Sequence, residues 1–260
     1  MRVTPPSEAG EGDVRLIGLR GVGDVAPGDD LAALVMDAAA ATRTPLADGD
    51  ILVVTQKVVS KAEGRLVDLR AVEPSALARR IADEYGKDAR YVEVVLGECV
   101  RIVRMERGLI IAQTQHGFVC ANAGVDASNV SGGDVACLLP LDSDASARRL
   151  RGDLRERAGV DVAVVVSDSF GRPWRMGIVN VAIGVAGMEP LMDYRGVPDD
   201  YGRVMHASIL AIADEVASAA ELVAGKVNRS PFVIVRGYPY PRGEGAARTL
   251  VMDPAMDLFR

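Results

Sequence analysis

Two aspartates far apart in the sequence, Asp126 and Asp168, have the chemistry and the neighbours that a divalent cation requires. Asp168 directly follows an apolar run at residues 162–166, where side chains meet at the end of a sheet, and Asp126 stands in an expected loop. Hard cations that bind phosphates prefer isolated carboxylates and hydroxyls, with water completing the coordination. With Ser169, the two aspartates predict a Mg²⁺ or Mn²⁺ site. Aspartate also favours turns and helix caps, so either residue alone would be weak evidence.

Lysine is rare in this chain, and two of the four lysines lie in one short segment. Lys57 and Lys61 follow Gln56, whereas arginine supplies most of the 30 basic residues. A lysine ammonium is a compact point charge with rotatable donors, which suits a phosphate oxygen. The segment is therefore either a phosphate-binding element or the solvated end of the apolar strand before it.

A glycine-rich stretch at residues 18–26 has small residues at Gly21, Gly23 and Ala26, the spacing of a dinucleotide-binding fingerprint. That fingerprint needs its third small residue inside a helix, whereas Ala26 is followed by Pro27 and Gly28. The fingerprint is therefore excluded. The remaining alternatives are a turn whose backbone N–H groups bind phosphate and a simple chain reversal.

The only tryptophan, Trp174, stands between Arg172 and Arg175. Arginine binds carboxylate or phosphate through two parallel hydrogen bonds, and an aromatic face supports a flat ring. The three residues therefore predict substrate contact, the alternative being a tryptophan packed at the rim of the core. His116 and His206 have no neighbours that would complete a catalytic triad, which disfavours nucleophilic catalysis.

Composition narrows the function classes further. With 30 basic and 36 acidic residues, the net charge is −6, which argues against a general nucleic-acid or anionic-membrane binder. Residues 1–13 contain no apolar block and predict a flexible tail, with residues 14–260 as the folded module. Three cysteines without zinc-like spacing suit a reducing cytoplasm.

Hydrophobic patterning predicts an α+β fold. We expect strands at residues 14–19, 51–55, 162–166 and 232–235, and helices at 30–41, 75–85, 142–158 and 203–224. The apolar runs at 91–96, 109–114 and 118–121 are separated by Gly and charged residues, which predicts antiparallel hairpins. Asp142 and Asp144 are expected to cap the helix that they begin. His206 would lie within the last helix.

Several of these segments together resemble the coenzyme F420:L-glutamate ligase family. The likeness runs in order from about residue 16 to 237 and rests on four separated motifs, at residues 56–65, 123–126 with Asn129, 144–148, and 167–175 with 181–187. The family resemblance implies two intertwined α+β lobes with mixed and antiparallel sheets. In some relatives of that family, a nitroreductase domain follows this module.

The resemblance also implies a reaction, namely GTP-dependent attachment of L-glutamate to coenzyme F420-0 through an acyl phosphate, followed by further γ-linked glutamates. It implies Mg²⁺ or Mn²⁺, K⁺ and a homodimer. By position in the motifs, the implied metal ligands are Asp126, Asp168 and Ser169, and the implied contacts to GTP are Gln56, Lys61, Asn129 and the loop Leu19, Arg20, Gly21 and Val22.

Asp126, Asp168 and Lys61 would carry catalysis by neutralising charge on the phosphates. Arg172 or Arg175 would bind the anionic tail of the coenzyme. Two alternatives stay open. The chain could be an NTP-dependent carboxylate-amine ligase that acts on a different acid, or a catalytically idle module for nucleotide binding or dimerisation.

Overall fold

The protein is described here by a computed structural model covering residues 13–127 and 134–258. The predicted tail lies outside the described residues except for Asp13. Helices are combined with antiparallel and mixed sheets, which confirms the α+β class. In the described part of the chain, none of the helices is both long and apolar enough to cross a bilayer.

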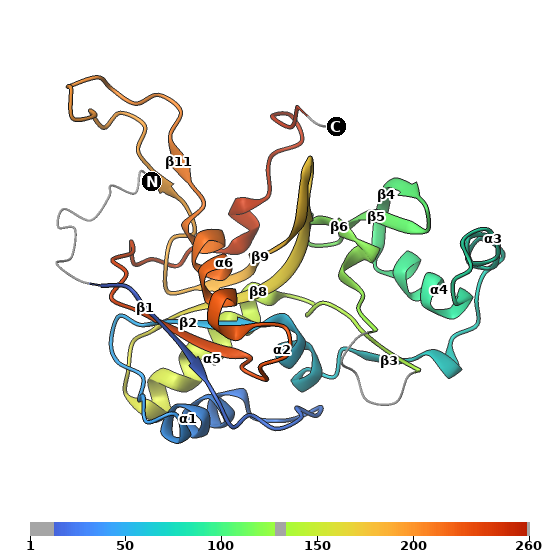
Figure 1. The fold of residues 1–260 in the computed structure, drawn as a ribbon, viewed down its shortest axis with the longest axis horizontal. Helices are drawn as coiled ribbons and strands as arrows, with labels where there is room; N and C mark the ends of the chain where they lie inside the picture. Colours follow the sequence, from blue (N-terminus) through green and yellow to red (C-terminus); the bar gives the residue numbers. More distant parts are fainter. Residues whose placement is uncertain (1–12, 128–133, 259–260) are drawn as a thin grey trace.

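A five-stranded sheet forms the centre of the larger lobe, in the order β1-β12-β2-β8-β9 (Figure 1). Only β2 and β8 run parallel to each other, and the other neighbours are antiparallel. Leu52 and Val54 face one apolar core and Ile51 and Val53 face the other, so β2 is buried on both faces. The strands of this sheet are β1 (Arg15–Leu19), β2 (Ile51–Thr55), β8 (Ala163–Arg172), β9 (Arg175–Ala186) and β12 (Phe232–Arg236).

Helices cover both faces of this sheet. Apolar residues of α1 (Leu31–Ala41) and α5 (Ser143–Ala158) pack on one face, and α6 (Ile212–Ala224) packs on the other. The start of α5 approaches β9 so closely that a Cβ on Gly184 would lie 2.3 Å from the carbonyl oxygen of Ser143. Only glycine fits at that crossing without a shift of the backbone.

The two aspartates that begin α5 have different roles. Asp142 caps the helix as predicted, because its side chain accepts a hydrogen bond from the Ala145 N–H at 2.8 Å. The capping role expected for Asp144 is wrong. Its buried carboxylate accepts hydrogen bonds from the N–H groups of Val185 at 2.8 Å and Ala247 at 2.7 Å, so it ties α5 to β9 and to the C-terminal segment.

The smaller lobe is formed by residues 66–127 and 134–138, which are inserted between α2 (Gln56–Ala62) and α5 and have a separate apolar core. Figure 1 shows this lobe to one side of the central sheet. It contains α3 (Ala76–Tyr85), α4 (Ala89–Gly97), the antiparallel sheet β4 (Cys99–Glu106), β5 (Leu109–Thr114) and β6 (Val119–Ala121), and the pair β3 (Leu66–Asp68) and β7 (Val135–Cys137).

Two hairpins extend from the larger lobe (Figure 1). The first is the end of β8 and β9, which turns at Trp174, a non-glycine residue with a positive φ of 57°. The second is formed by β10 (Met192–Asp193) and β11 (Ile209–Leu210), with residues 194–208 between them. Short 3₁₀ turns, η1 (Leu69–Ala71), η2 (Asn122–Gly124) and η3 (Ala247–Leu250), complete the described elements.

Several predicted elements are confirmed, and the structure differs from the sequence-based interpretation at four places. Residues 91–96 lie in α4 and form no strand, because Asp88 caps this helix and Val92 and Val95 bury one face. The helix expected at 203–224 begins only at Ile212, which leaves His206 outside it. The segment from Gln56 to Lys61 is helix α2, so it is no strand end. The strand leading to Asp168 also continues to Arg172, which places this aspartate inside a strand where a loop was expected.

Candidate active site

Asp126 and Asp168 come together where the smaller lobe meets the central sheet. Asp168 lies on β8, and Asp126 follows η2. The backbone of Asp126 is fixed by two hydrogen bonds with Cys137 of β7, one from the Asp126 N–H at 2.9 Å and one to its carbonyl at 2.8 Å. The charge of Asp126 raises the pKa of Asp168, so the two carboxylates lie within electrostatic reach of each other.

Burial raises the pKa of Asp168 to about 6, and the nearby charge of Asp126 adds to this effect. Three groups act in the opposite direction: the Ser169 N–H, which donates a hydrogen bond to Asp168 Oδ1 at 2.8 Å, and the ammonium groups of Lys57 and Lys226. Lys57 also forms an ion pair with Asp126 at 2.7 Å. Two carboxylates held this close disfavour a second negative charge unless a cation joins them.

The carboxylate pair therefore suits a hard divalent cation, with water completing the coordination. In the described part of the chain, no group of three or more His, Cys, Asp and Glu side chains could hold a metal ion. A metal here would have to use the two carboxylates together with neutral oxygens and the oxygens of a bound phosphate.

Ser169 is not brought into this pair by its side chain. Successive residues of a strand point to opposite faces, and the Ser169 hydroxyl donates a hydrogen bond to Asn180 Oδ1 at 2.7 Å and accepts one from Lys226. Asn180 in turn donates to Glu221 of α6 at 3.0 Å. The hydroxyl thus belongs to a polar network on the α6 side of the sheet, and Lys226 is the positive charge within this network.

Helix α2 presents both lysines of the predicted phosphate-binding segment. Lys57 and Lys61 are four residues apart, so they lie on the same face of α2, and Lys57 already contacts Asp126. Gln56 is different. Its side chain is buried, and its amide nitrogen donates hydrogen bonds to Ser60 Oγ at 2.6 Å and to the Leu138 carbonyl at 3.0 Å. Gln56 therefore also ties α2 to the smaller lobe.

The predicted nucleotide loop after β1 lies beside the loop that precedes β12. An ion pair of 2.7 Å joins Asp24 to Arg229, and Ser230 Oγ donates a hydrogen bond to the Leu19 carbonyl at 2.8 Å. Among the residues predicted to contact GTP, Leu19 is buried and Val22 packs against the core. Gly21 has a positive φ of 85°. The Arg20 N–H donates a hydrogen bond to Thr42 Oγ1. The predicted contact Asn129 lies outside the described residues.

The predicted substrate contacts Arg172, Trp174 and Arg175 occupy the end of the β8–β9 hairpin. Trp174 is 82% exposed, and Arg172 donates a hydrogen bond to the Met176 carbonyl at 2.8 Å. Because a strand rises ~3.3 Å per residue, Arg172 lies roughly 13 Å along β8 from Asp168. The structure therefore separates these three residues from the carboxylate pair by part of the hairpin.

Tyr91 of α4 was not predicted from the sequence, and it supports the position of Asp126. Its hydroxyl donates a hydrogen bond at 2.7 Å to the carbonyl of Val125, the residue before Asp126. Burial raises the pKa of Tyr91 to about 12, and the charge of Asp126 contributes. Nothing in the sequence indicated this contact, because it depends on residues 91–96 forming a helix.

Comparison with known proteins identifies the family. The sequence matches the F420-0:gamma-glutamyl ligase family over residues 21–237, a range that includes the carboxylate pair, α2 and the loop before β12 and that begins within the predicted nucleotide loop. The chain belongs to this family. It is therefore an enzyme, a ligase that forms amide bonds.

Two relatives of this ligase illustrate the similarity. A coenzyme F420:L-glutamate ligase of Methanothermobacter thermautotrophicus is 44% identical over 250 residues, which cover 95% of this chain and 99% of the relative. A protein of the same description from Methanopyrus kandleri is 48% identical over 241 residues, covering 91% of this chain and 93% of the relative. The similarity therefore extends over both lobes of the ligase.

Proposed function

We propose that this ligase attaches L-glutamate to coenzyme F420-0 at the expense of GTP and then extends a γ-linked glutamate tail. The observation that carries the proposal is the convergence of Asp126 and Asp168 beside the lysine-bearing face of α2. Carboxylates and lysines arranged in this way are suited to a metal–nucleotide complex. The names of the relatives supply the acid and the amine.

The reaction has two steps. An oxygen of the coenzyme carboxylate attacks the γ-phosphorus of GTP, which forms an acyl phosphate and releases GDP. The amine of glutamate then attacks the acyl carbon, so that an amide forms, inorganic phosphate leaves and the amine loses a proton. Both steps pass through states rich in negative charge, and positive charge held in position lowers their barriers.

Individual residues have distinct roles in this proposal. Asp126 and Asp168 would hold Mg²⁺ or Mn²⁺, which would neutralise charge on the phosphates. Lys61 would contact the nucleotide directly, while Lys57 orients Asp126 through their ion pair. The loop at residues 19–22, with Gln56 and Asn129, would complete the nucleotide site. Ser169 would contribute through its backbone or after a rearrangement of its bond to Lys226. K⁺ would be a further cofactor, for which we assign no residues.

The decisive experiment measures turnover of purified protein with GTP, Mn²⁺, L-glutamate and coenzyme F420-0. We expect GDP release that requires both the coenzyme and glutamate, and a coenzyme whose mass increases by whole glutamate residues. Glutamate-dependent GDP release with another acid but not with the coenzyme would instead indicate a ligase for that acid. Nucleotide binding without any turnover would indicate the idle module.

We also propose that the enzyme acts as a homodimer. The end of the β8–β9 hairpin exposes apolar side chains, with Met176 95% and Ile178 57% exposed. Apolar side chains grouped on a projecting hairpin are typical of a surface that another chain covers. Sedimentation equilibrium should give twice the chain mass of 27.5 kDa, and a mass of one chain at micromolar concentration would contradict the proposal.

A further inference from the structure

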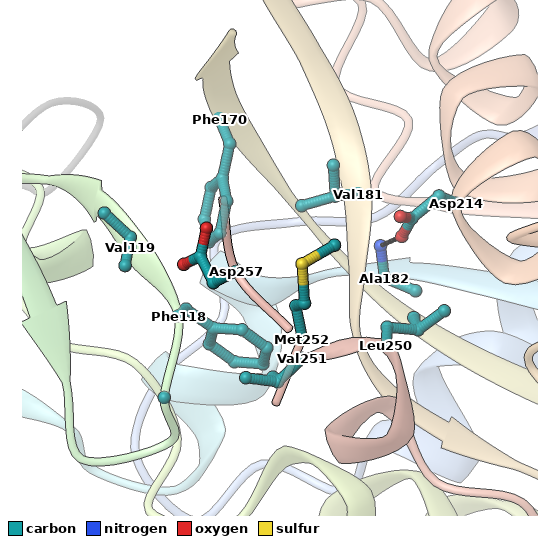
Figure 2. Close-up of a pocket in the computed structure, with 11 residues that line it drawn as sticks. Phe118, Val119, Phe170, Val181, Ala182, Asp214, Leu250, Val251, Met252 and Asp257 are labelled. Atoms are coloured by element: carbon teal, nitrogen blue, oxygen red, sulfur yellow. Dashed lines mark hydrogen bonds between the residues drawn. The ribbon is translucent and has the colours of Figure 1, made fainter. Parts of the chain in front are cut away.

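An open cavity of about 250 Å³ lies between the β8–β9 hairpin, the turn before β6 and the C-terminal segment. Figure 2 shows its lining, which includes Phe118, Phe170, Val181, Met252, Leu250 and Asp214. Most of these side chains are apolar. The cavity has no assigned role in the two-step reaction, and none of its lining residues was among the predicted site residues.

Two aromatic rings shape one side of the cavity. Phe118 and Phe170 meet edge to face, with ring centroids 6.0 Å apart and planes inclined by 69°. His116 stacks on Phe118, with ring centroids 5.7 Å apart. Met252 approaches from the C-terminal segment (Figure 2). An aromatic wall facing an adaptable thioether side chain is typical of a site for a flat ring.

The cavity is adjacent to the carboxylate pair. Phe170 is two residues beyond Asp168 on β8, so both side chains point to the same face of the strand. Val181, which also lines the cavity, is the residue of β9 that pairs with Asp168. A molecule whose ring occupied the cavity would therefore have its attached groups within a few residues of the candidate metal site.

We propose that this cavity binds the flat ring system of the acid substrate, so that the tail of that substrate reaches Asp168. This inference rests on the proposed function, whose acid substrate, coenzyme F420-0, carries a flat deazaflavin ring. The volume is consistent with it, because whole ligands occupy pockets of about 300–1,000 Å³. A cavity below that range holds one ring system and leaves the anionic tail outside.

Asp214 gives the cavity a polar group that suits this ring. Its carboxylate accepts a hydrogen bond from the Ala182 N–H at 2.8 Å, and burial raises its pKa. The second acidic residue of the lining is Asp257. Carboxylates repel a phosphate or carboxylate group, which further excludes the anionic tail. They accept hydrogen bonds from ring N–H groups, and the pyrimidinedione edge of a deazaflavin provides one.

The test fills the cavity at Met252 and uses Met256 as a matched control. Both residues belong to the same exposed C-terminal segment, but only Met252 lines the cavity. We expect Met252→Trp to weaken binding of coenzyme F420-0 at least tenfold, measured by the fluorescence of its ring without GTP or glutamate. Met256→Trp should bind like wild type. Thermal unfolding of both variants would show that each is folded.

Direct binding separates this inference from the proposed function. Unchanged coenzyme affinity in folded Met252→Trp would overturn the assignment of the cavity, even if the wild-type enzyme ligates glutamate. Selective loss of affinity in that variant would support the assignment, whatever the nucleotide requirement of turnover. If the wild-type enzyme is active, Met252→Trp should show a higher KM for the coenzyme than the wild type and an unchanged KM for GTP.

Discussion

Replacing Asp168 by Asn should abolish ligation and, at the same time, stabilise the metal-free protein above pH 6. Asn keeps the size of the side chain and an oxygen that accepts the hydrogen bond from the Ser169 N–H. It removes the negative charge that, together with Asp126, would hold the cation. Stabilisation of phosphate charge by a metal amounts to several kcal/mol, so we expect turnover to fall on the order of 10³-fold.

The effect on stability follows from the pKa of the same carboxyl. Its value of about 6 in the folded protein lies above its ordinary 3.8, so the folded state binds the proton more tightly than the unfolded state does. Stability of the wild type therefore decreases as the pH rises from about 4 to about 6, and the loss persists above pH 6. The shift corresponds to ~3 kcal/mol. Because Asp168 is partly exposed, we expect a gain of about 1–2 kcal/mol in Asp168→Asn.

Chemical denaturation of metal-free protein at pH 4 and pH 8 would measure this difference. The variant should match the wild type near pH 4 and exceed it at pH 8. Mn²⁺ should raise the stability of the wild type and have little effect on the variant, because a ligand that binds only the folded state stabilises it. Asp142→Asn is a suitable control, since asparagine also caps helices. A variant that keeps wild-type turnover would exclude Asp168 from the reaction.

Local sequence patterns predicted four of the five strands of the central sheet and the helices with capping residues, because these features depend on neighbouring residues, whereas β9 was missed. The alternation of Ile51, Leu52, Val53 and Val54 between two cores requires a strand buried on both faces. The helix at residues 89–97 was missed because its valines also favour strands, and burial of Val92 and Val95 in the smaller lobe decides the outcome. Tertiary packing here overrides local preference.

The residue types of the candidate site could be predicted from the sequence, but the directions of its side chains could not. Asp126 and Asp168 were identified by residue type, and the structure brings them together. The direction of the Ser169 side chain could not be predicted, since it depends on whether Asp168 ends the strand or lies within it. The cavity at Phe170 and Met252 combines segments far apart in the chain, and no local pattern marks such residues.

Replacing Lys61 by Ala should lower kcat/KM for GTP about 100-fold while leaving the binding of the coenzyme unchanged. Lys61 lies one turn beyond Lys57 on the same face of α2, and Lys57 contacts Asp126, so this face is directed toward the carboxylate pair. A hydrogen bond between an ammonium and a phosphate contributes about 1.5–3 kcal/mol. Its loss corresponds to ~10- to 150-fold in rate, with the upper part of this range expected because the transferred phosphoryl group gains charge there.

Two further variants distinguish a nucleotide contact from a structural role. Lys61→Arg keeps the positive charge and should recover part of the activity, because a planar guanidinium replaces a point charge with different geometry. Lys87 follows α3 in the smaller lobe, and Lys87→Ala should behave like wild type. Equal losses in the alanine and arginine variants with unchanged GTP affinity would contradict the assignment. A fall in kcat/KM for GTP alone, with normal thermal stability, would place the Lys61 ammonium on the nucleotide.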